Sequence, residues 1–300
     1  MPASGVVERE LPDRSWAYAL ELPSAWRCAG GSSSQARGAR GMIETESRGP
    51  ARWIFIANPK VVNAVGTADL ERLREEIVSA AADDAIALIV LAGRAGNFCS
   101  GDNLKESAVM DRAAFRSLIA AFQELAWAAE NSPKPLAAFV EGYALGGGAE
   151  IALMCDFVVA ERTATIGCPE VALSGMISNG SSAFLGQALG LARASQLVLL
   201  SERRRADDPL LAGAFNLVGS REECLKWLNG AADRLASSPP AAVHRARQAL
   251  RAPGRQGRLA ALTEELMQAM DLYGSPAYKQ AASAFAHGAR TGVTTSDSDR

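Results

Sequence analysis

Two glutamates stand in surroundings where an acidic side chain is unusual. Glu150 follows the glycine triplet 146–148 by two residues in an otherwise apolar helix start, and Glu170 follows Pro169 in the stretch GCPEV. Burying an ionised carboxylate without a partner is expensive, so each is a candidate acid or base. The alternatives are that Glu150 only favours the dipole at a helix N-terminus and that Glu170 is an ordinary loop acid.

The glycine triplet is a candidate site for negative charge. A strand that ends in a glycine turn and continues as a helix leaves unpaired N–H groups at the start of the helix, and these favour a developing anion. Glycine also lets another atom approach the backbone closely. Taken alone, however, the triplet would equally fit a plain tight turn.

The elements that must position these residues alternate along the chain. Short strands are expected at 43–46, 52–57, 86–91, 136–140 and 157–160, and helical patterns lie between them at 67–82 and 111–130. This alternation predicts an α/β layered core. Helical spacing then dominates, at 192–200, 221–236, 240–251 and 258–271. We therefore expect an α/β core over 42–230 and a helical C-terminal region over 231–300 that ends in a disordered tail. A Gly/Ser/Arg-rich run closes residues 1–41, which we expect to be a flexible extension.

Composition excludes several classes of protein. Of 300 residues, 48% are apolar and 21% are charged, and the net charge is -2, so nothing predicts binding to nucleic acid or to an anionic membrane. The apolar stretch 137–160 contains Glu141, Glu150 and Asp156, which indicates core rather than a membrane span. Acids at residues 8–13 argue against a signal peptide, and five cysteines without a CxxC pair fit a reducing compartment, so we expect a cytoplasmic protein.

Three segments together resemble a known family. They read GNFCSGDNLKE at 96–106, PLAAFVEGYALGGGAEIALMCDFVVA at 135–160 and ATIGCPEVALSGMI at 164–177. With Asn58-Pro59, Asn63-Ala64 and the segment 201–218, they are similar to the enoyl-CoA hydratase/isomerase, or crotonase, superfamily over about 42–290. The resemblance implies a crotonase-like (ClpP/crotonase) spiral of β-β-α units and a homotrimer or dimer of trimers. It implies that the enzyme uses no metal or redox cofactor. It also implies that the substrate is a thioester of coenzyme A or of an acyl carrier.

The resemblance also implies roles for individual residues. The amides of Gly147 and Asp102 match the positions that hold the thioester oxygen as the carbonyl becomes an enolate. Glu150 and Glu170 match the two acids of the hydratases; two carboxylates in one dry pocket cannot both ionise easily, and the pair then offers an acid and a base. We assign water activation to Glu150 and proton delivery at the α-carbon to Glu170. The expected substrate contacts are Ser100, Gly101, Lys105, Gly146, Ser178 and Asn179.

Two departures from the family leave the chemistry open. Asp102 replaces a small residue, and its carboxylate would repel an oxyanion unless it points away. The segment 176–182 (MISNGSS) replaces a Pro-Gly-x-Gly-Gly turn and makes one pocket wall more polar. An isomerase, decarboxylase or thioester hydrolase on the same fold therefore stays open, as does an acyl-CoA-binding protein with little turnover.

Other clusters have plainer interpretations. The run Arg203–Arg205 is typical of a solvated helix start or turn. A second set of arginines would form a helix face or contact a phosphate, and consists of Arg245, Arg247, Arg251, Arg255 and Arg258. Cys99 and Cys168 flank the two site loops, but no base near either thiol is evident to make it a nucleophile.

Overall fold

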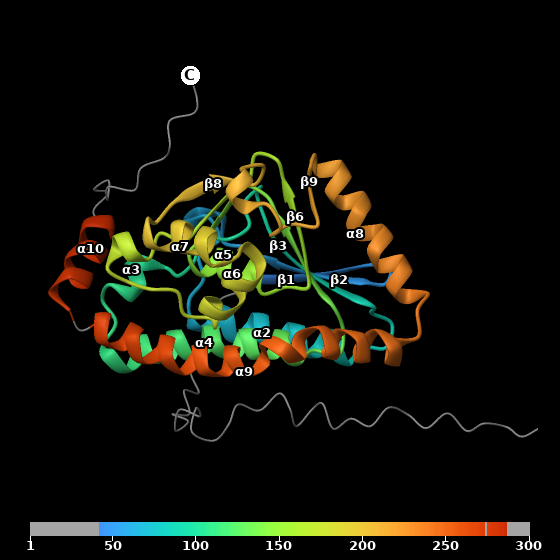
Figure 1. The fold of residues 1–300 in the computed structure, drawn as a ribbon, viewed down its shortest axis with the longest axis horizontal. Coiled ribbons are helices and arrows are strands. Elements are labelled where there is room, and N and C mark those ends of the chain that lie inside the picture. The colour runs from blue at the N-terminus through green and yellow to red at the C-terminus, as the bar shows by residue number, and fades with distance from the viewer. Residues whose placement is uncertain (1–41, 274, 287–300) are drawn as a thin grey trace, which may run out of the picture.

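The core of the molecule is a six-stranded sheet with helices on both faces (Figure 1). The computed structural model describes residues 42–273 and 275–286. The strand order is β1-β2-β3-β4-β6-β9, and every neighbouring pair is parallel except β1 and β2. The strands are β1 (Ile43–Arg48), β2 (Ala51–Ile56), β3 (Leu88–Gly93), β4 (Leu136–Val140), β6 (Phe157–Glu161) and β9 (Leu217–Gly219). The α/β layered architecture predicted from the alternating pattern is thus confirmed.

A smaller, three-stranded sheet leads into the two segments that carry Glu150 and Glu170. Its order is β5-β7-β8, with β5 (Tyr143–Leu145) parallel to β7 (Thr165–Gly167) and β7 antiparallel to β8 (Arg203–Arg205). The prediction of a turn or helix start for the three arginines is therefore wrong. Their backbone pairs with β7, and their side chains form ion pairs with neighbouring acids, such as Arg204 with Glu202 and Arg205 with Asp207.

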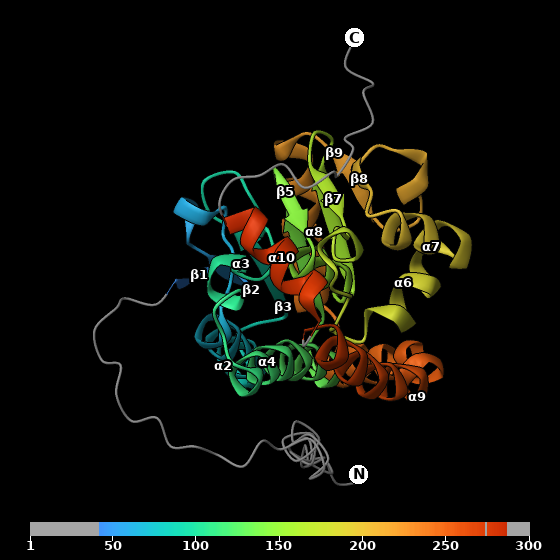
Figure 2. The ribbon, with the colours of Figure 1, turned by 90° about the vertical axis from the view of Figure 1, so that its left-hand side faces the viewer.

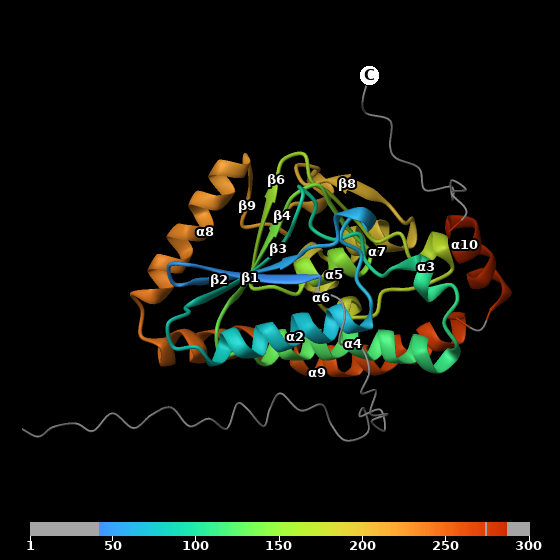
Figure 3. The ribbon, with the colours of Figure 1, turned by 180° about the vertical axis from the view of Figure 1, so that it is seen from behind.

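The longer helices cover both faces of the large sheet. The helices are α2 (Thr67–Ala82), α3 (Leu104–Ser107), α4 (Arg112–Asn131), α5 (Gly147–Leu153), α6 (Ser181–Leu189), α7 (Leu191–Leu199), α8 (Arg221–Ala236), α9 (Pro240–Tyr273) and α10 (Pro276–Ala286). In Figures 1 and 3, α8 lies on one side of the sheet and α2, α4 and α9 form a layer on the other. Short 3-10 turns lie at Pro59–Val61, Val171–Leu173 and Pro209–Leu211.

Strand β3 shows why its sequence is continuously apolar. Val90 packs into the core beneath α8, whereas Ile89 and Leu91 pack into the larger core with α2 and α4. Successive side chains of a strand point to opposite faces, so a strand covered on both faces is apolar throughout. The strand begins at Leu88 rather than at Ile86, because Ile86 is still in the turn that closes α2 and its N–H donates to Asp83 O (3.0 Å).

The C-terminal helices differ from the prediction at one point. Where two helices were expected at 240–251 and 258–271, α9 is a single helix with Pro253 inside it. Proline normally ends or kinks a helix, but buried ion pairs hold this one on both sides of the proline. Arg251 and Arg258, which flank Pro253, both contact Glu130 on α4 (2.7 and 2.5 Å).

Two terminal predictions cannot be placed on this fold. The expected flexible extension at 1–41 and the expected disordered tail lie outside the described residues. The division into a core and a C-terminal region stays a prediction. Among the residues that are described, no helix has both the length and the apolar character needed to span a membrane.

Candidate active site

The glycine triplet forms the predicted turn between β5 and α5. Gly146 has a φ of +54°, which residues with a side chain rarely adopt, and Gly147 begins the helix. A Cβ atom on Gly147 would lie 2.7 Å from the ring of Phe122, and one on Gly148 would lie 2.1 Å from the carbonyl oxygen of Cys99. Close packing as well as backbone conformation therefore requires glycine here.

The loop after β3 lies directly against this turn. Cys99 N–H donates to Tyr143 O (2.9 Å) and Leu145 N–H donates to Cys99 O (3.0 Å), so the loop continues the small sheet beyond β5. A Cβ atom on Gly101 would be 3.2 Å from the amide nitrogen of Gly147. The loop thus brings the backbone preceding Asp102 next to the start of α5.

The amides of Gly147 and Asp102 are both left out of the neighbouring backbone ladders. Gly147 is the first residue of α5, so its N–H has no partner within the helix. At the bridge between Val65 and Asp102, the hydrogen bonds use Gly101 O and the N–H of Asn103 rather than the amide of Asp102. These are the two groups predicted to hold an oxyanion.

Glu150 is held by the segment that follows the second acid. Its Oε2 accepts hydrogen bonds from the amides of Ser178 and Asn179 (2.9 Å each) and from the hydroxyl of Ser181. The side chain is buried, and burial raises the pKa of Glu150, while these three donors oppose the rise. The donors stabilise the ionised form of this carboxylate.

Glu170 has the opposite environment. Both of its carboxylate oxygens are buried, and neither has a hydrogen-bond partner within the described residues. Burial first, and then the negative charge of Glu150, raise the pKa of Glu170 well above its usual range. Of two carboxyls close to one another, the one without donors is the one that keeps its proton.

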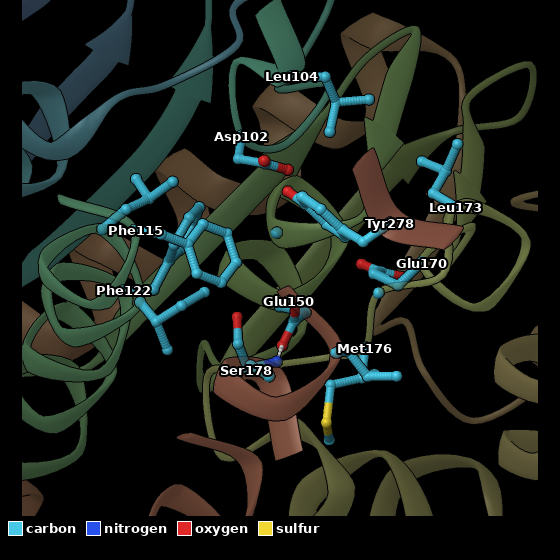
Figure 4. Close-up of a pocket in the computed structure, with 16 residues that line it drawn as sticks. Asp102, Leu104, Phe115, Phe122, Glu150, Glu170, Leu173, Met176, Ser178 and Tyr278 are labelled. Carbon is cyan, nitrogen blue, oxygen red and sulfur yellow. Dashed lines mark hydrogen bonds between the residues drawn. The ribbon is translucent and has the colours of Figure 1, made fainter. Parts of the chain in front are cut away.

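These groups surround one small cavity (Figure 4). The cavity has a volume of about 70 Å³. Its lining includes Asp102, Phe122, Gly147, Glu150, Glu170, Met176, Ser178 and Tyr278. The two glutamates, twenty positions apart in the sequence, therefore meet at the same space. Within residues 42–273 and 275–286, no group of three or more His, Cys, Asp or Glu side chains could hold a metal ion.

Asp102 lines the cavity, so its carboxyl is not turned away from the site. It accepts a hydrogen bond from the hydroxyl of Ser107 (3.1 Å), and Figure 4 shows it facing the hydroxyl of Tyr278. Burial raises the pKa of Asp102. Its charge in turn contributes to the raised pKa of both Glu150 and Glu170.

The remaining predicted contacts lie near the site but differ in their environment. Gly101 and Gly146 are buried in the backbone framework described above. The Ser100 hydroxyl donates to Val61 O (3.1 Å), and Lys105 is exposed on α3. Ser178 lines the cavity, whereas Asn179 lines a second cavity between α6 and α9.

Two alternative interpretations lose support. Burial raises the pKa of Cys99 to about 12 and that of Cys168 well above its usual value, which disfavours a thiolate nucleophile at either. Four of the five clustered arginines pack as a helix face. Arg247 and Arg251 bind Asp156 (2.8 Å each), Arg251 and Arg258 bind Glu130, and Arg255 donates to the amide oxygen of Asn131 (2.5 Å).

Sequence reasoning missed two buried residues from the C-terminal helices. Tyr278 of α10 lines the cavity, and Glu265 of α9 binds the segment 180–182. A signal for Glu265 was available, because it interrupts the buried face of α9 formed by Leu262 and Ala269. Figure 2 shows α10 beside α3, and Tyr278 of α10 lines the cavity.

Comparison with known proteins decides the family. The family model described as enoyl-CoA hydratase/isomerase matches residues 52–289. The chain belongs to this family. It is 35% identical over 220 residues to 2,3-dehydroadipyl-CoA hydratase of Escherichia coli (strain K12), covering 73% of this chain and 84% of that protein. It is 33% identical over 205 residues to a probable enoyl-CoA hydratase of Rhizobium meliloti (strain 1021), covering 67% and 77% respectively.

Solved structures agree with this assignment. An enoyl-CoA hydratase/isomerase from Xanthobacter autotrophicus Py2 superposes with a TM-score of 0.77 at 25% identity, covering 84% of this chain and 95% of that one. An enoyl-CoA hydratase from Mycobacterium avium subsp. paratuberculosis K-10 gives a TM-score of 0.75 at 25% identity, covering 85% and 99%. The protein is thus an enzyme of the hydratase/isomerase family with the crotonase fold, and that resemblance is confirmed.

Proposed function

We propose that this enzyme adds water to the double bond of a 2-enoyl thioester, or removes water from the 3-hydroxyacyl thioester. The single observation that carries the proposal is that Glu150 and Glu170 line one cavity together with Gly147. An acid, a base and a main-chain amide are the groups that the reaction needs. The relatives named as enoyl-CoA hydratases support the same reaction class.

The contrasting environments of the glutamates support a division of labour. Glu150, held ionised by three donors, takes a proton from water as the water oxygen bonds to carbon 3. The electrons of the double bond move to the thioester oxygen, where the amides of Gly147 and Asp102 stabilise the enolate. Glu170, whose pKa is raised by burial and by the charge of Glu150, delivers its proton to carbon 2. The carbonyl then re-forms.

The substrate is a thioester, with coenzyme A as the carrier that the relatives' names favour. Lys105 is exposed beside the site and is suited to a phosphate, and Ser100 and Gly101 lie in the same loop. The cavity that the two glutamates line is also bordered by apolar side chains such as Phe122 and Leu272, which suit an acyl chain.

Assembly and location complete the proposal. We infer a homotrimer or a dimer of trimers in the cytoplasm, and light scattering of the purified protein tests the assembly. A mass corresponding to the monomer of 31.5 kDa across the working concentration range would contradict it.

The experiment that tests the reaction is a panel of enoyl-CoA and enoyl-carrier thioesters, varied in chain length and polarity. We expect mass spectrometry of the products to show a gain of one water on the acyl chain of at least one substrate. Tight binding across the panel with no product would favour a thioester-binding protein instead.

One observation favours a second candidate, an enoyl-CoA isomerase. Glu150 is engaged by Ser178, Asn179 and Ser181, which leaves Glu170 as the one glutamate at the cavity without a partner in the described residues. A single carboxyl suffices to move a proton between carbons 2 and 4. Isomerisation leaves the mass unchanged while the double bond moves, so the same panel separates the two activities.

A further inference from the structure

The segment 178–182 is held between two buried glutamates from different helices. Glu150 of α5 accepts hydrogen bonds from residues 178, 179 and 181, as described above. Glu265 of α9 accepts from the remaining positions: its Oε2 from the amide of Gly180 (2.6 Å), and its Oε1 from the amide (2.9 Å) and the hydroxyl (2.6 Å) of Ser182. Each residue of the segment thus donates to one carboxylate or the other.

Helix α9 also shapes this segment through its backbone. Gln123 of α4 donates to the carbonyl oxygens of both Ser178 (3.1 Å) and Leu262 (2.8 Å), which links the segment to α9 a second time. Gly180 has a φ of +79°, and a Cβ atom there would lie 3.1 Å from Leu262. The segment is therefore packed against α9 as well as bonded to it.

The reacting position of Glu150 depends on these contacts. The three donors to its carboxylate belong to residues 178, 179 and 181. The other two residues of the segment, Gly180 and Ser182, donate to Glu265. Glu265 is 1% exposed and does not line the cavity, so it cannot act on substrate directly. Any displacement of residues 180–182 would displace the donors at 178, 179 and 181 with them.

We propose that Glu265 is a positioning residue that holds the water-activating carboxylate of Glu150 in place through the segment 178–182. This inference rests on the proposed hydration. It goes beyond it by assigning the C-terminal helix a specific part in forming the carbon–oxygen bond. It assigns α9 no part in the proton transfer at carbon 2, which belongs to Glu170.

The test compares two reactions of one protein. Hydration of an enoyl-CoA requires both glutamates, whereas exchange of the α-hydrogens of a saturated acyl-CoA with deuterium oxide requires only Glu170 and the oxyanion amides. In Glu265→Gln, an amide group replaces one acceptor oxygen and faces the donors of Gly180 or Ser182. A misplacement of about 1 Å can cost roughly 100-fold in rate, so we expect kcat for hydration to fall about 10–100-fold with KM nearly unchanged. Exchange should stay within about threefold of the wild type.

Two controls keep the outcome interpretable. Glu264→Gln changes the neighbouring, exposed glutamate and should leave both reactions unchanged. Ser182→Ala removes one donor to Glu265 and should lower hydration in the same direction by a smaller factor, which provides a milder variant if Glu265→Gln folds poorly. Equal loss of both reactions in Glu265→Gln, or unchanged hydration, would overturn the positioning role. Absence of hydration in the wild type would instead refute the proposed function.

Discussion

One oxygen of Glu150 accepts three hydrogen bonds from residues 178–181, whereas neither oxygen of Glu170, at the same cavity, has a partner within the described residues. The two carboxyls are close enough that the charge of Glu150 raises the pKa of Glu170. The three donors favour the ionised form of Glu150, whereas burial and the charge of Glu150 favour the protonated form of Glu170.

Gly147→Ala should abolish most activity. The added Cβ would lie 2.7 Å from the buried ring of Phe122, so the ring or the start of α5 must move, and the oxyanion amide moves with it. Loss of one oxyanion donor typically lowers kcat about 100–1,000-fold. Steady-state kinetics provides the measurement. Gly230→Ala, in the open interior of α8, is the matched control and should keep full activity with unchanged or slightly higher stability.

Asp102→Asn should move the alkaline limb of the pH–rate profile to lower pH. The charge of Asp102 helps to raise the pKa of Glu170, so removing it lowers that pKa. Glu170 must be protonated to act as the acid, and activity is lost as the pH rises through its pKa. The profile of kcat for hydration measures the shift. The control is Glu106→Gln, an exposed neighbour, which should leave the alkaline limb at its wild-type pH. An alkaline limb that does not move in Asp102→Asn would show that the carboxyl of Asp102 is neutral in the working enzyme.

The free energy of unfolding should depend on pH because of Glu265. Burial, with repulsion from Glu150, raises the pKa of Glu265 to about 7. Above its usual pKa of 4.5 and below this value, the folded state holds a proton that the unfolded chain has lost, so the wild type loses stability as the pH rises from about 4.5 to about 7. Relative to Glu265→Gln, the wild type should lose on the order of 1 kcal/mol of unfolding free energy per pH unit in that window. Urea unfolding at several pH values checks this, and a constant difference between the two proteins would contradict it.

Arg247→Met should destabilise the fold without affecting substrate binding. Arg247 is buried, binds Asp156, and donates to the carbonyl oxygens of Ala129, Glu130 and Ser132. Removing one partner of a buried ion pair costs about 3–5 kcal/mol. Thermal unfolding should show this loss of stability for Arg247→Met. Arg245→Met, on the exposed side of the same helix, should leave the stability unchanged. A raised KM for the CoA thioester with unchanged stability would instead favour phosphate binding by this cluster.

The sequence indicated much of this fold and only part of the site. Helix α2 and strand β4 have the predicted bounds, because their apolar periodicity and flanking breakers are local signals. Pro253 misled the prediction of α9, since the buried ion pairs that keep the helix continuous come from α4 and lie far away in the sequence. Spacing alone could not bring Glu150 and Glu170 together; the family resemblance suggested it.

The contribution of the C-terminal helices was the part least accessible from sequence. Tyr278 reaches the cavity, and Glu265 reaches the segment 178–182, only because α9 and α10 fold back across α4 and α3. A buried glutamate on an amphipathic helix signals that some partner exists, but the partner here is a backbone segment with no charge of its own. Such a partner leaves no compositional mark in the sequence.

The most direct measurement of the central claim is kcat for enoyl-CoA hydration by Glu150→Gln and by Glu170→Gln, with correct folding checked by circular dichroism. Acid–base catalysis by a positioned side chain contributes about 100–10,000-fold, so each variant should lose activity in that range, and the double variant should lose little more than the worse single one. Rates close to the wild type in both single variants would contradict the account.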